Sequence, residues 1–270
     1  MRYCRFLLDN QVHYGAVEER AGEPWIVDLT SAPEEDHYFR LVHGRATSWS
    51  FDFEPTALSA AELLPPVTPS KIVCVGRNYR DHAKELGNEV PAEPLLFFKP
   101  PSSLLKPGGT ILLPAASTRV DFEGELALVI GHRIRNLKPG AGWRSLIRGY
   151  TIANDVTARD LQKKDGQWTR GKGFDTFCPV GPVVSDEVDP EAGLTVETRV
   201  NGELRQQGST LDFIFRIPEL LVYISAIFTL EPGDLVLTGT PAGVGPLAAG
   251  DRVEVAIPGL GVLFNTIEPE

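Results

Sequence analysis

The sequence contains little cysteine, little positive charge and no long apolar run. Its three cysteines in 270 residues form no Cys-x-x-Cys pair, which argues against a disulfide framework or a structural zinc site. Lysine and arginine number 26 against 36 aspartates and glutamates, so the formal net charge is −10. This acidic balance argues against nucleic acid or an anionic membrane as a partner.

Targeting segments and nucleotide-binding motifs are also missing from the sequence. The first residues, MRYCRFLLDNQ, lack the apolar core of a signal peptide, and the apolar runs are too short to cross a bilayer. Because cysteine is also scarce, we expect a cytoplasmic protein. Neither Gly-x-Gly-x-x-Gly nor the P-loop pattern occurs, so nothing predicts nucleotide binding.

The chain divides at a proline-rich connector. Short strands are expected within residues 1–30, and residues 56–64 have a helical pattern. Three prolines then fall within residues 65–69, which makes this segment stiff and extended. We therefore predict a small β-rich N-terminal domain over 1–66 and a larger domain over 67–270.

Strand patterns dominate the larger domain. Residues 71–76 form an apolar strand pattern, a short helix is expected over 77–86, and Pro218 opens an apolar helical run. Asn201-Gly202 between two alternating segments predicts a hairpin with a type I′ turn. The pattern as a whole predicts an α+β fold that is mostly β.

The stretch DFEGELALVI, residues 121–130, places three carboxylates at every second position. Side chains alternate along a strand, so Asp121, Glu123 and Glu125 should point the same way. Such close like charges destabilise a fold unless something binds them, although a solvated strand face is the alternative. Gly124 between the glutamates would allow a ligand or another backbone to approach. Carboxylate oxygens favour a hard cation such as Mg²⁺, Mn²⁺ or Ca²⁺.

Asp155 is the expected third carboxylate. It lies where an apolar strand gives way to a helical pattern, which is a common position for a ligand or active-site residue. The same position would also suit an aspartate that caps the following helix. Spacing alone leaves both roles open.

A histidine and a glutamate share one face of the expected helix over 77–86. Glu85 follows His82 at the third position, where a carboxylate can orient an imidazole and raise its basicity. Such a pair suits a general base, while an ordinary surface contact is the alternative. Three of the five histidines fall within the first 66 residues, so a histidine base in the larger domain is His82 or His132.

Several cations and one loop complete the candidate features. Arg77, Lys99, Arg159 and Lys172 could bind the carboxylates of a substrate, or could be ordinary surface residues. The glycine-rich loop over 238–245 could bring backbone N–H groups to a carboxylate, or could be a plain turn.

These motifs, taken in order, resemble those of the fumarylacetoacetate hydrolase family over roughly residues 70–267. The residues that carry the resemblance are Gly76-Arg77-Asn78-Tyr79 with His82 and Glu85, Phe98-Lys99-Pro100, Phe122-Glu123-Gly124-Glu125-Leu126, Gly149-Tyr150-Thr151, Asn154-Asp155-Val156-Thr157-Ala158-Arg159-Asp160, Lys172-Gly173-Phe174-Asp175 and Thr238-Gly239-Thr240-Pro241.

The resemblance implies a fold, a cofactor and an assembly. The fold is a β-roll core, to which residues 1–66 add the small N-terminal region of the shorter family members. The cofactor is Mg²⁺ or Mn²⁺, held by Glu123, Glu125 and Asp155. Asp121 is left as a neighbour of the site or a surface residue. The resemblance also implies a homodimer.

The resemblance further assigns roles around the metal. His82 and Glu85 match a catalytic pair on a lid helix, and Lys172 matches a lysine near the substrate. Arg159, Gln162 and Thr240 match residues that position the substrate. Arg77 is added to them as a cation expected to bind the substrate.

The implied activity is hydrolysis of a C–C bond in an acylpyruvate-type 2,4-dioxo acid, which releases pyruvate through a metal-stabilised enolate. Loss of CO₂ from oxaloacetate generates the same enolate, and tautomerisation of a 2-hydroxy-dienoate passes through a related one. Isomerisation of 2-hydroxy-dienedioates and tautomerisation or decarboxylation of oxaloacetate therefore stay open as alternatives. A non-catalytic protein that binds a metal and a 2-oxo acid is a second alternative. The features that favour an enzyme over such a protein are the intact set Glu123, Glu125, Asp155, His82, Glu85 and Lys172. Hydrolysis needs a water-activating base, and the intact His82–Glu85 pair favours it.

Overall fold

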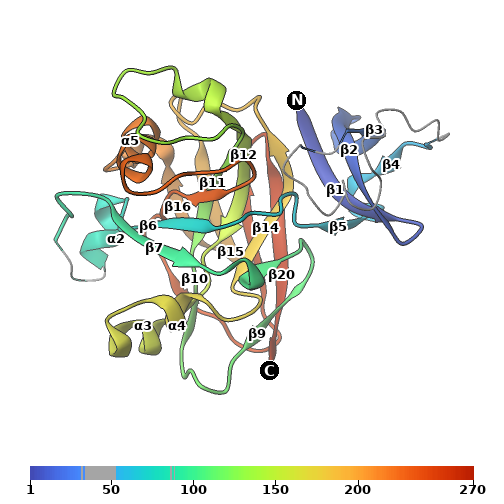
Figure 1. The fold of residues 1–270 in the computed structure, drawn as a ribbon. Coiled ribbons are helices and arrows are strands. Elements are labelled where there is room, and N and C mark those ends of the chain that lie inside the picture. Colours follow the sequence, from blue (N-terminus) through green and yellow to red (C-terminus); the bar gives the residue numbers. More distant parts are fainter. Residues whose placement is uncertain (32, 34–52, 86, 88) are drawn as a thin grey trace.

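The protein is mostly β (Figure 1). The computed structural model describes residues 1–31, 33, 53–85, 87 and 89–270. The strands are β1 (Arg2–Leu8), β2 (Gln11–Arg20), β3 (Glu23–Thr30), β4 (Thr56–Ala57), β5 (Glu62–Leu64), β6 (Ile72–Gly76), β7 (Leu95–Lys99), β8 (Leu104–Leu105), β9 (Thr110–Leu113), β10 (Val120–Phe122), β11 (Gly124–Ile130), β12 (Ile147–Asn154), β13 (Thr157–Ala158), β14 (Cys178–Ser185), β15 (Thr195–Val200), β16 (Glu203–Ser209), β17 (Leu235–Leu237), β18 (Gly245–Pro246), β19 (Arg252–Ile257) and β20 (Gly261–Pro269). The helices are α2 (Arg80–Glu85), α3 (Arg159–Asp165), α4 (Thr169–Lys172) and α5 (Ile217–Ile227), with 3₁₀ turns at Leu58–Ala60, Pro101–Ser103, Trp143–Leu146 and Thr210–Asp212. The predicted α+β, mostly β fold is confirmed.

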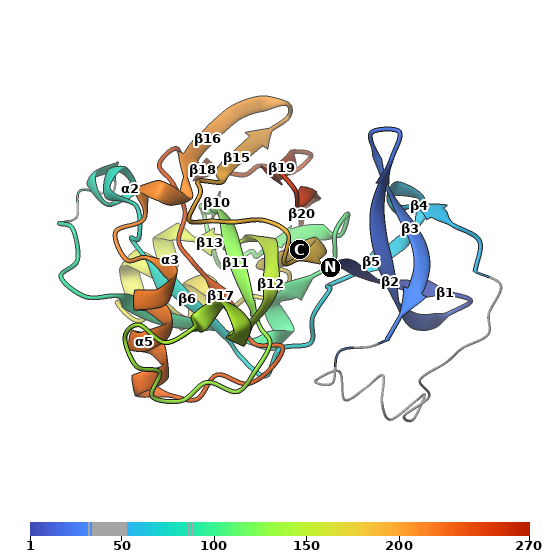
Figure 2. The same cartoon turned by 90° about the horizontal axis from the view of Figure 1, so that it is seen from above.

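One large sheet joins the N-terminal strands to strands of the larger predicted domain. Its strand order is β4-β3-β2-β1-β14-β12-β11-β17-β6-β7, and off this path β5 pairs with β1 and β8 pairs with β14. The N-terminal strands lie beside the main body and join it through β1, whose Arg2 and Tyr3 pair with Ser185 and Val184 of β14 (Figure 2). The boundary after residue 66 stays a prediction, since the sheet continues from one side of it to the other.

A second sheet, in the order β16-β15-β19-β20-β9, packs against the middle of the first. Leu126 and Leu128 of β11 face Val255 and Leu263 of this sheet in one apolar cluster, which α5 also covers. Ala127 of β11 belongs to a different cluster on the opposite face, as alternation along a strand requires. The apolar run after the acidic stretch is therefore buried on both faces.

The turn at Asn201-Gly202 is confirmed as the hairpin between β15 and β16. Both residues have positive φ, 52° and 82°, as a type I′ turn requires. This hairpin matters for the site described below, because it brings Gln206 of β16 against the acidic stretch.

Two helix expectations need correction. The helix expected over 56–64 is wrong: the segment forms β4, a 3₁₀ turn and β5, because β5 pairs with β1 and this tertiary pairing outweighs the local helical pattern. The helix expected over 77–86 is shorter, since α2 begins at Arg80. Arg77 cannot be helical, because its backbone is left-handed with φ 57°. The side chain of Asn78 forms hydrogen bonds with backbone groups of Phe215 and Thr238.

The three cysteines are free and buried, and burial raises the pKa of Cys4 and of Cys178 to about 12. In the part of the chain that the structure describes, no helix has the length and apolar character needed to cross a membrane.

Asp234 anchors the start of β6 and β17 from a fully buried position. Its carboxylate accepts hydrogen bonds from the backbone N–H groups of Ser70, Lys71 and Glu231, and it pairs with the Lys71 ammonium. Replacement by alanine leaves these donors unpaired, so we expect Asp234→Ala to lower the free energy of unfolding by about 3 kcal/mol. Urea unfolding checks this value.

Asp251 provides the matched control for Asp234. It also accepts a backbone N–H in a turn, from Ala248, but this bond is exposed to solvent. Asp251→Ala should cost less than about 1 kcal/mol. Equal losses in the two variants would contradict an anchoring role for Asp234.

Candidate active site

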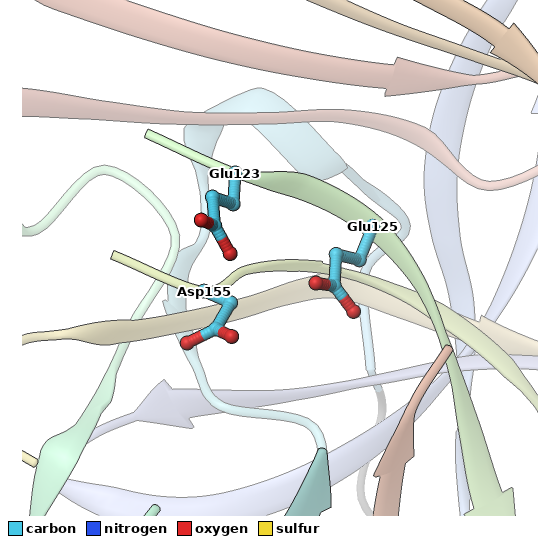
Figure 3. A group of neighbouring side chains, drawn as sticks. All are labelled: Glu123, Glu125 and Asp155. Atoms are coloured by element: carbon cyan, nitrogen blue, oxygen red, sulfur yellow. The ribbon is translucent and has the colours of Figure 1, made fainter. Parts of the chain in front are cut away.

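Three buried carboxylates converge at one end of β11 (Figure 3). Glu123, Glu125 and Asp155 each offer an oxygen atom, and these atoms lie within 4.8 Å of one another. Each residue is at most 5% exposed. Such a cluster of desolvated negative charge needs compensation from cations of the protein or from a bound ion.

Local chain geometry produces this convergence. Alternation along the acidic stretch puts Glu123 and Glu125 on one face, as the sequence predicts. Pairing of β11 with β12 then sets Gly124 opposite Asn154, and the N–H of Asp155 donates to the carbonyl of Glu123. Asp155 therefore enters the same space from the neighbouring strand.

Two buried lysines hold the aspartate side of the cluster. The ammonium of Lys172 lies 2.7 Å from Glu123 Oε2 and 2.6 Å from Asp155 Oδ2. Lys99 lies 2.7 Å from Asp155 Oδ1 and also donates to the carbonyls of Val156 and Lys172. The carboxylate of Asp155 is therefore paired with two lysines, and no side chain caps α3. The helix-capping interpretation of Asp155 is wrong.

An arginine links Glu123 to the remaining acid of the stretch. Arg159 Nη2 lies 2.5 Å from Glu123 Oε1, and its Nε lies 2.9 Å from Asp121 Oδ2. Arg119 also forms a bidentate pair with Asp121, whose carboxylate is fully buried. Asp121 is therefore a buried support for Arg159 rather than a surface residue, and it lies outside the cluster of three.

The two glutamates differ in their electrostatic surroundings. Burial opposes ionisation of Glu123, but the charges of Lys172 and Arg159 outweigh it and hold the pKa of Glu123 below its ordinary value. Burial raises the pKa of Glu125 well above its ordinary value, and the charges of Asp155 and Glu123 add to this effect. Among the described residues Glu125 has no cation in direct contact, and its carboxylate accepts the N–H of Gly239.

The predicted His82–Glu85 pair is present on α2. Nδ1 of His82 lies 3.2 Å from Glu85 Oε2, and the imidazole is buried. Glu85 also accepts the N–H of Gly243 in the glycine-rich loop. Backbone N–H groups of this loop therefore do meet carboxylates, those of Glu85 and Glu125.

A cavity of about 440 Å³ joins these groups. The predicted site residues that line it are Arg77, His82, Glu123, Glu125, Asp155, Arg159, Gln162, Lys172 and Thr240. Glu85 contacts the cavity through His82, whereas Lys99 lies behind Asp155 and does not line it. His132 is exposed elsewhere, so His82 is the histidine that the structure brings to the acids.

Three residues that shape the site were given no role from the sequence. Asn154 Oδ1 accepts the N–H of Glu123, and Gln206 Oε1 accepts the N–H of Gly124. Trp168 forms part of the cavity wall and packs against Gly76, where an added Cβ would lie 2.9 Å from its ring. A place for Asn154 near the site could be expected because it directly precedes Asp155. No sequence signal marks Gln206 or Trp168.

The donor set fits a hard divalent cation. Three carboxylates provide only oxygen ligands, which suit Mg²⁺ and Mn²⁺, and their placement at the wall of a cavity leaves room for a substrate to share the ion. Glu125 has no salt bridge among the described residues, so it is the carboxylate that such an ion would compensate most directly.

Comparisons with known proteins show which family the chain resembles. The model of the fumarylacetoacetate (FAA) hydrolase C-terminal family matches residues 71–268. A mitochondrial oxaloacetate tautomerase of Arabidopsis thaliana is 50% identical over 205 residues, which cover 74% of this chain and 91% of that protein.

Two solved structures are similar over most of the chain. A 5-carboxymethyl-2-hydroxymuconate delta-isomerase from Mycobacterium smegmatis is 37% identical with a TM-score of 0.85, and the match covers 100% of both chains. A fumarylpyruvate hydrolase from Pseudomonas aeruginosa, solved with Mn²⁺ and pyruvate, is 34% identical with a TM-score of 0.69. That match covers 76% of this chain and 91% of the other.

Proposed function

Because the chain belongs to the fumarylacetoacetate hydrolase family, we propose that it is a divalent-metal-dependent enzyme that interconverts the keto and enol forms of a small 2-oxo diacid such as oxaloacetate. The observation that carries this proposal is the meeting of three buried carboxylates, a buried histidine and Lys172 in one cavity. The similarity to an oxaloacetate tautomerase supports the choice of reaction.

The charge of the cavity supports a diacid substrate. Five cations and three carboxylates line it, in a protein whose net charge is −10. Neither Arg77 nor Lys163 forms an ion pair within the described ranges, and both face the cavity. The two carboxylates of a diacid substrate could pair with these two cations.

The metal and the residues would have separate tasks. Glu123, Glu125 and Asp155 would hold the cation, which when bound supplies Lewis-acid polarisation of the 2-oxo oxygen. His82 Nε2 is available to the substrate because Nδ1 faces Glu85. It would take a proton from the carbon beside the 2-oxo group and return it to the oxygen. Lys172 would stabilise the negative charge that develops on that oxygen.

Hydrolysis of an acylpyruvate is the second candidate. The His82–Glu85 pair favours it, since the same Nε2 could take a proton from water as the water attacks the distal carbonyl. The similarity to a fumarylpyruvate hydrolase supports it as well. A homodimer in the cytoplasm stays a prediction, to which size-exclusion chromatography gives the first test.

Removal of the metal tests the function directly. We expect protein treated with EDTA to lose its activity on enol-oxaloacetate, and Mg²⁺ or Mn²⁺ to restore it, because Lewis-acid polarisation is worth several kcal/mol. Loss of the enol absorbance reports tautomerisation, and coupled lactate dehydrogenase reports pyruvate from acetylpyruvate, fumarylpyruvate or oxaloacetate. Reactions with metal but without protein correct for the spontaneous rate.

Each outcome of this experiment decides between the candidates. Pyruvate released from an acylpyruvate faster than oxaloacetate tautomerises would favour hydrolysis. Activity that survives EDTA would contradict the metal requirement. Bound Mn²⁺ without turnover of any of these compounds would favour a binding protein over an enzyme.

A further inference from the structure

The peptide between the two glutamates of the site is held by side chains from other parts of the chain. The N–H of Glu123 donates to Asn154 Oδ1 at 2.9 Å, and the N–H of Gly124 donates to Gln206 Oε1 at 3.0 Å. The carbonyl of Gly124 accepts the hydroxyl of Thr240 at 2.8 Å. At Gly124, therefore, side chains take both backbone hydrogen bonds.

Gly124 cannot carry a side chain of its own. An added Cβ would collide with Thr198 Oγ1 and would lie 2.9 Å from Val255 Cγ1 on the second sheet. The close approach of the two sheets thus fixes this position from one side, and the hydrogen bonds described above fix it from the other.

Gln206 closes a ring of hydrogen bonds around Gly124. Its Oε1 accepts from Gly124, its Nε2 donates to Thr240 Oγ1 at 2.7 Å, and the Thr240 hydroxyl donates back to the carbonyl of Gly124. Nε2 also donates to the carbonyl of Pro241 at 2.7 Å. The ring ties the acidic stretch to the glycine-rich loop, which itself bonds Glu125 through the N–H of Gly239.

Only an amide of this length makes all three contacts of Gln206. A backbone N–H can only donate and a carbonyl can only accept, so Gly124 and Pro241 fix which end of the amide is oxygen and which is nitrogen. A carboxylate could not donate to Thr240 or Pro241. The side chain is 1% exposed, so water does not replace a lost partner.

We propose that Gln206 is a positioning residue that sets the separation and direction of Glu123 and Glu125 for metal binding. It does not line the cavity, so it acts through Gly124 and the glycine-rich loop rather than on the substrate. The proposal rests on the proposed metal site and adds to it a residue from a hairpin some 80 positions away in the sequence.

The test compares near-isosteric variants of two buried amides. Gln206→Met keeps the length of the side chain but removes all three bonds. Asn265→Leu removes the bonds that Asn265 Nδ2 donates to Lys106 and Gly109, far from the site, and so controls for loss of stability. Gln207→Leu controls for substitution on the exposed face of the same strand.

Isothermal calorimetry with Mn²⁺ gives the main result. We expect Gln206→Met to raise the Kd for Mn²⁺ by about 10–100-fold, as is typical when a residue that orients metal ligands is lost. Asn265→Leu and Gln207→Leu should keep the wild-type Kd. If Gln206→Met does not fold, Gln206→Asn retains an amide that is too short to reach both sides, and it should also weaken binding. An unchanged Kd in a folded Gln206 variant would overturn the proposal.

Hydrogen exchange tests the same idea without metal. In Gln206→Met, peptides that cover residues 120–128 and 238–244 should exchange faster than in the wild type, while peptides from β20 should not. If the wild type binds no Mn²⁺, the proposed function fails, and exchange still decides whether Gln206 holds the acidic stretch. Unchanged exchange in both segments would contradict the positioning role.

Discussion

His82→Ala should lower kcat on enol-oxaloacetate by about 10²–10⁴-fold, the usual contribution of a general acid–base residue. The imidazole lines the cavity, and Nδ1 faces Glu85, so Nε2 is the ring nitrogen left to exchange a proton with the substrate. The Kd for Mn²⁺ should stay close to that of the wild type, because His82 is not one of the three carboxylate ligands. Stopped-flow measurement of enol loss and calorimetry check the two expectations.

His132→Ala is the matched control, because His132 is exposed and lies away from the cavity. Its kcat should equal that of the wild type. A His82→Ala enzyme with full turnover on its best substrate would exclude His82 as the base, whichever reaction that substrate undergoes.

Glu125→Gln should abolish metal binding without harming the fold. Burial raises the pKa of Glu125 well above its ordinary value of 4.5, so an ionised carboxylate at this position is costly, and the neutral amide of glutamine avoids that cost. Glutamine can still accept the N–H of Gly239. We expect kcat/KM to fall by about 10²–10³-fold, which corresponds to the several kcal/mol of Lewis-acid stabilisation.

The raised pKa of Glu125 also predicts that the stability of the metal-free wild type depends on pH. The unfolded chain loses this proton near pH 4.5, whereas the folded protein keeps it to a higher pH. Stability should therefore be greatest below pH 4.5 as far as this group is concerned, and should fall as pH rises through the raised pKa. In Glu125→Gln, the free energy of unfolding measured with urea should lose this part of its dependence on pH. The same pH dependence of stability in the two proteins would contradict its assignment to Glu125.

Asp155→Asn gives the contrasting result. Its carboxylate is paired with Lys99 and Lys172, both buried, and removal of one partner from such a group costs about 3–5 kcal/mol. We therefore expect Asp155→Asn to lose both metal binding and stability, whereas Glu125→Gln loses only metal binding. Equal stability of the two variants would show that the lysines do not depend on Asp155.

The sequence was informative where local geometry decides the outcome. The two-residue spacing of Glu123 and Glu125 settles which face they share, and the spacing of three settles that Glu85 meets His82. Lys99 was harder to interpret, because a cation at the end of an apolar strand can bind substrate or a buried acid. The structure places it behind Asp155.

Long-range packing decided what the sequence could not. Gln206 and Gln207 are identical neighbours, and only the register of the hairpin against the acidic stretch determines that the first faces inward. The helix expected over residues 56–64 was wrong for the same reason, because β5 pairs with β1 at the start of the chain. In both cases the decisive contact joins segments that no local pattern connects.

Continuity of the large sheet through β1 and β14 has a consequence for the evolution of this architecture. The N-terminal strands cover the open side of β14 with backbone hydrogen bonds, so they protect an edge that would otherwise invite pairing with a second molecule. A family member without these strands must blunt that edge by another device, such as a charged side chain, a proline or a subunit contact. The small N-terminal segment thus covers a strand edge of the main body as well as packing against β14.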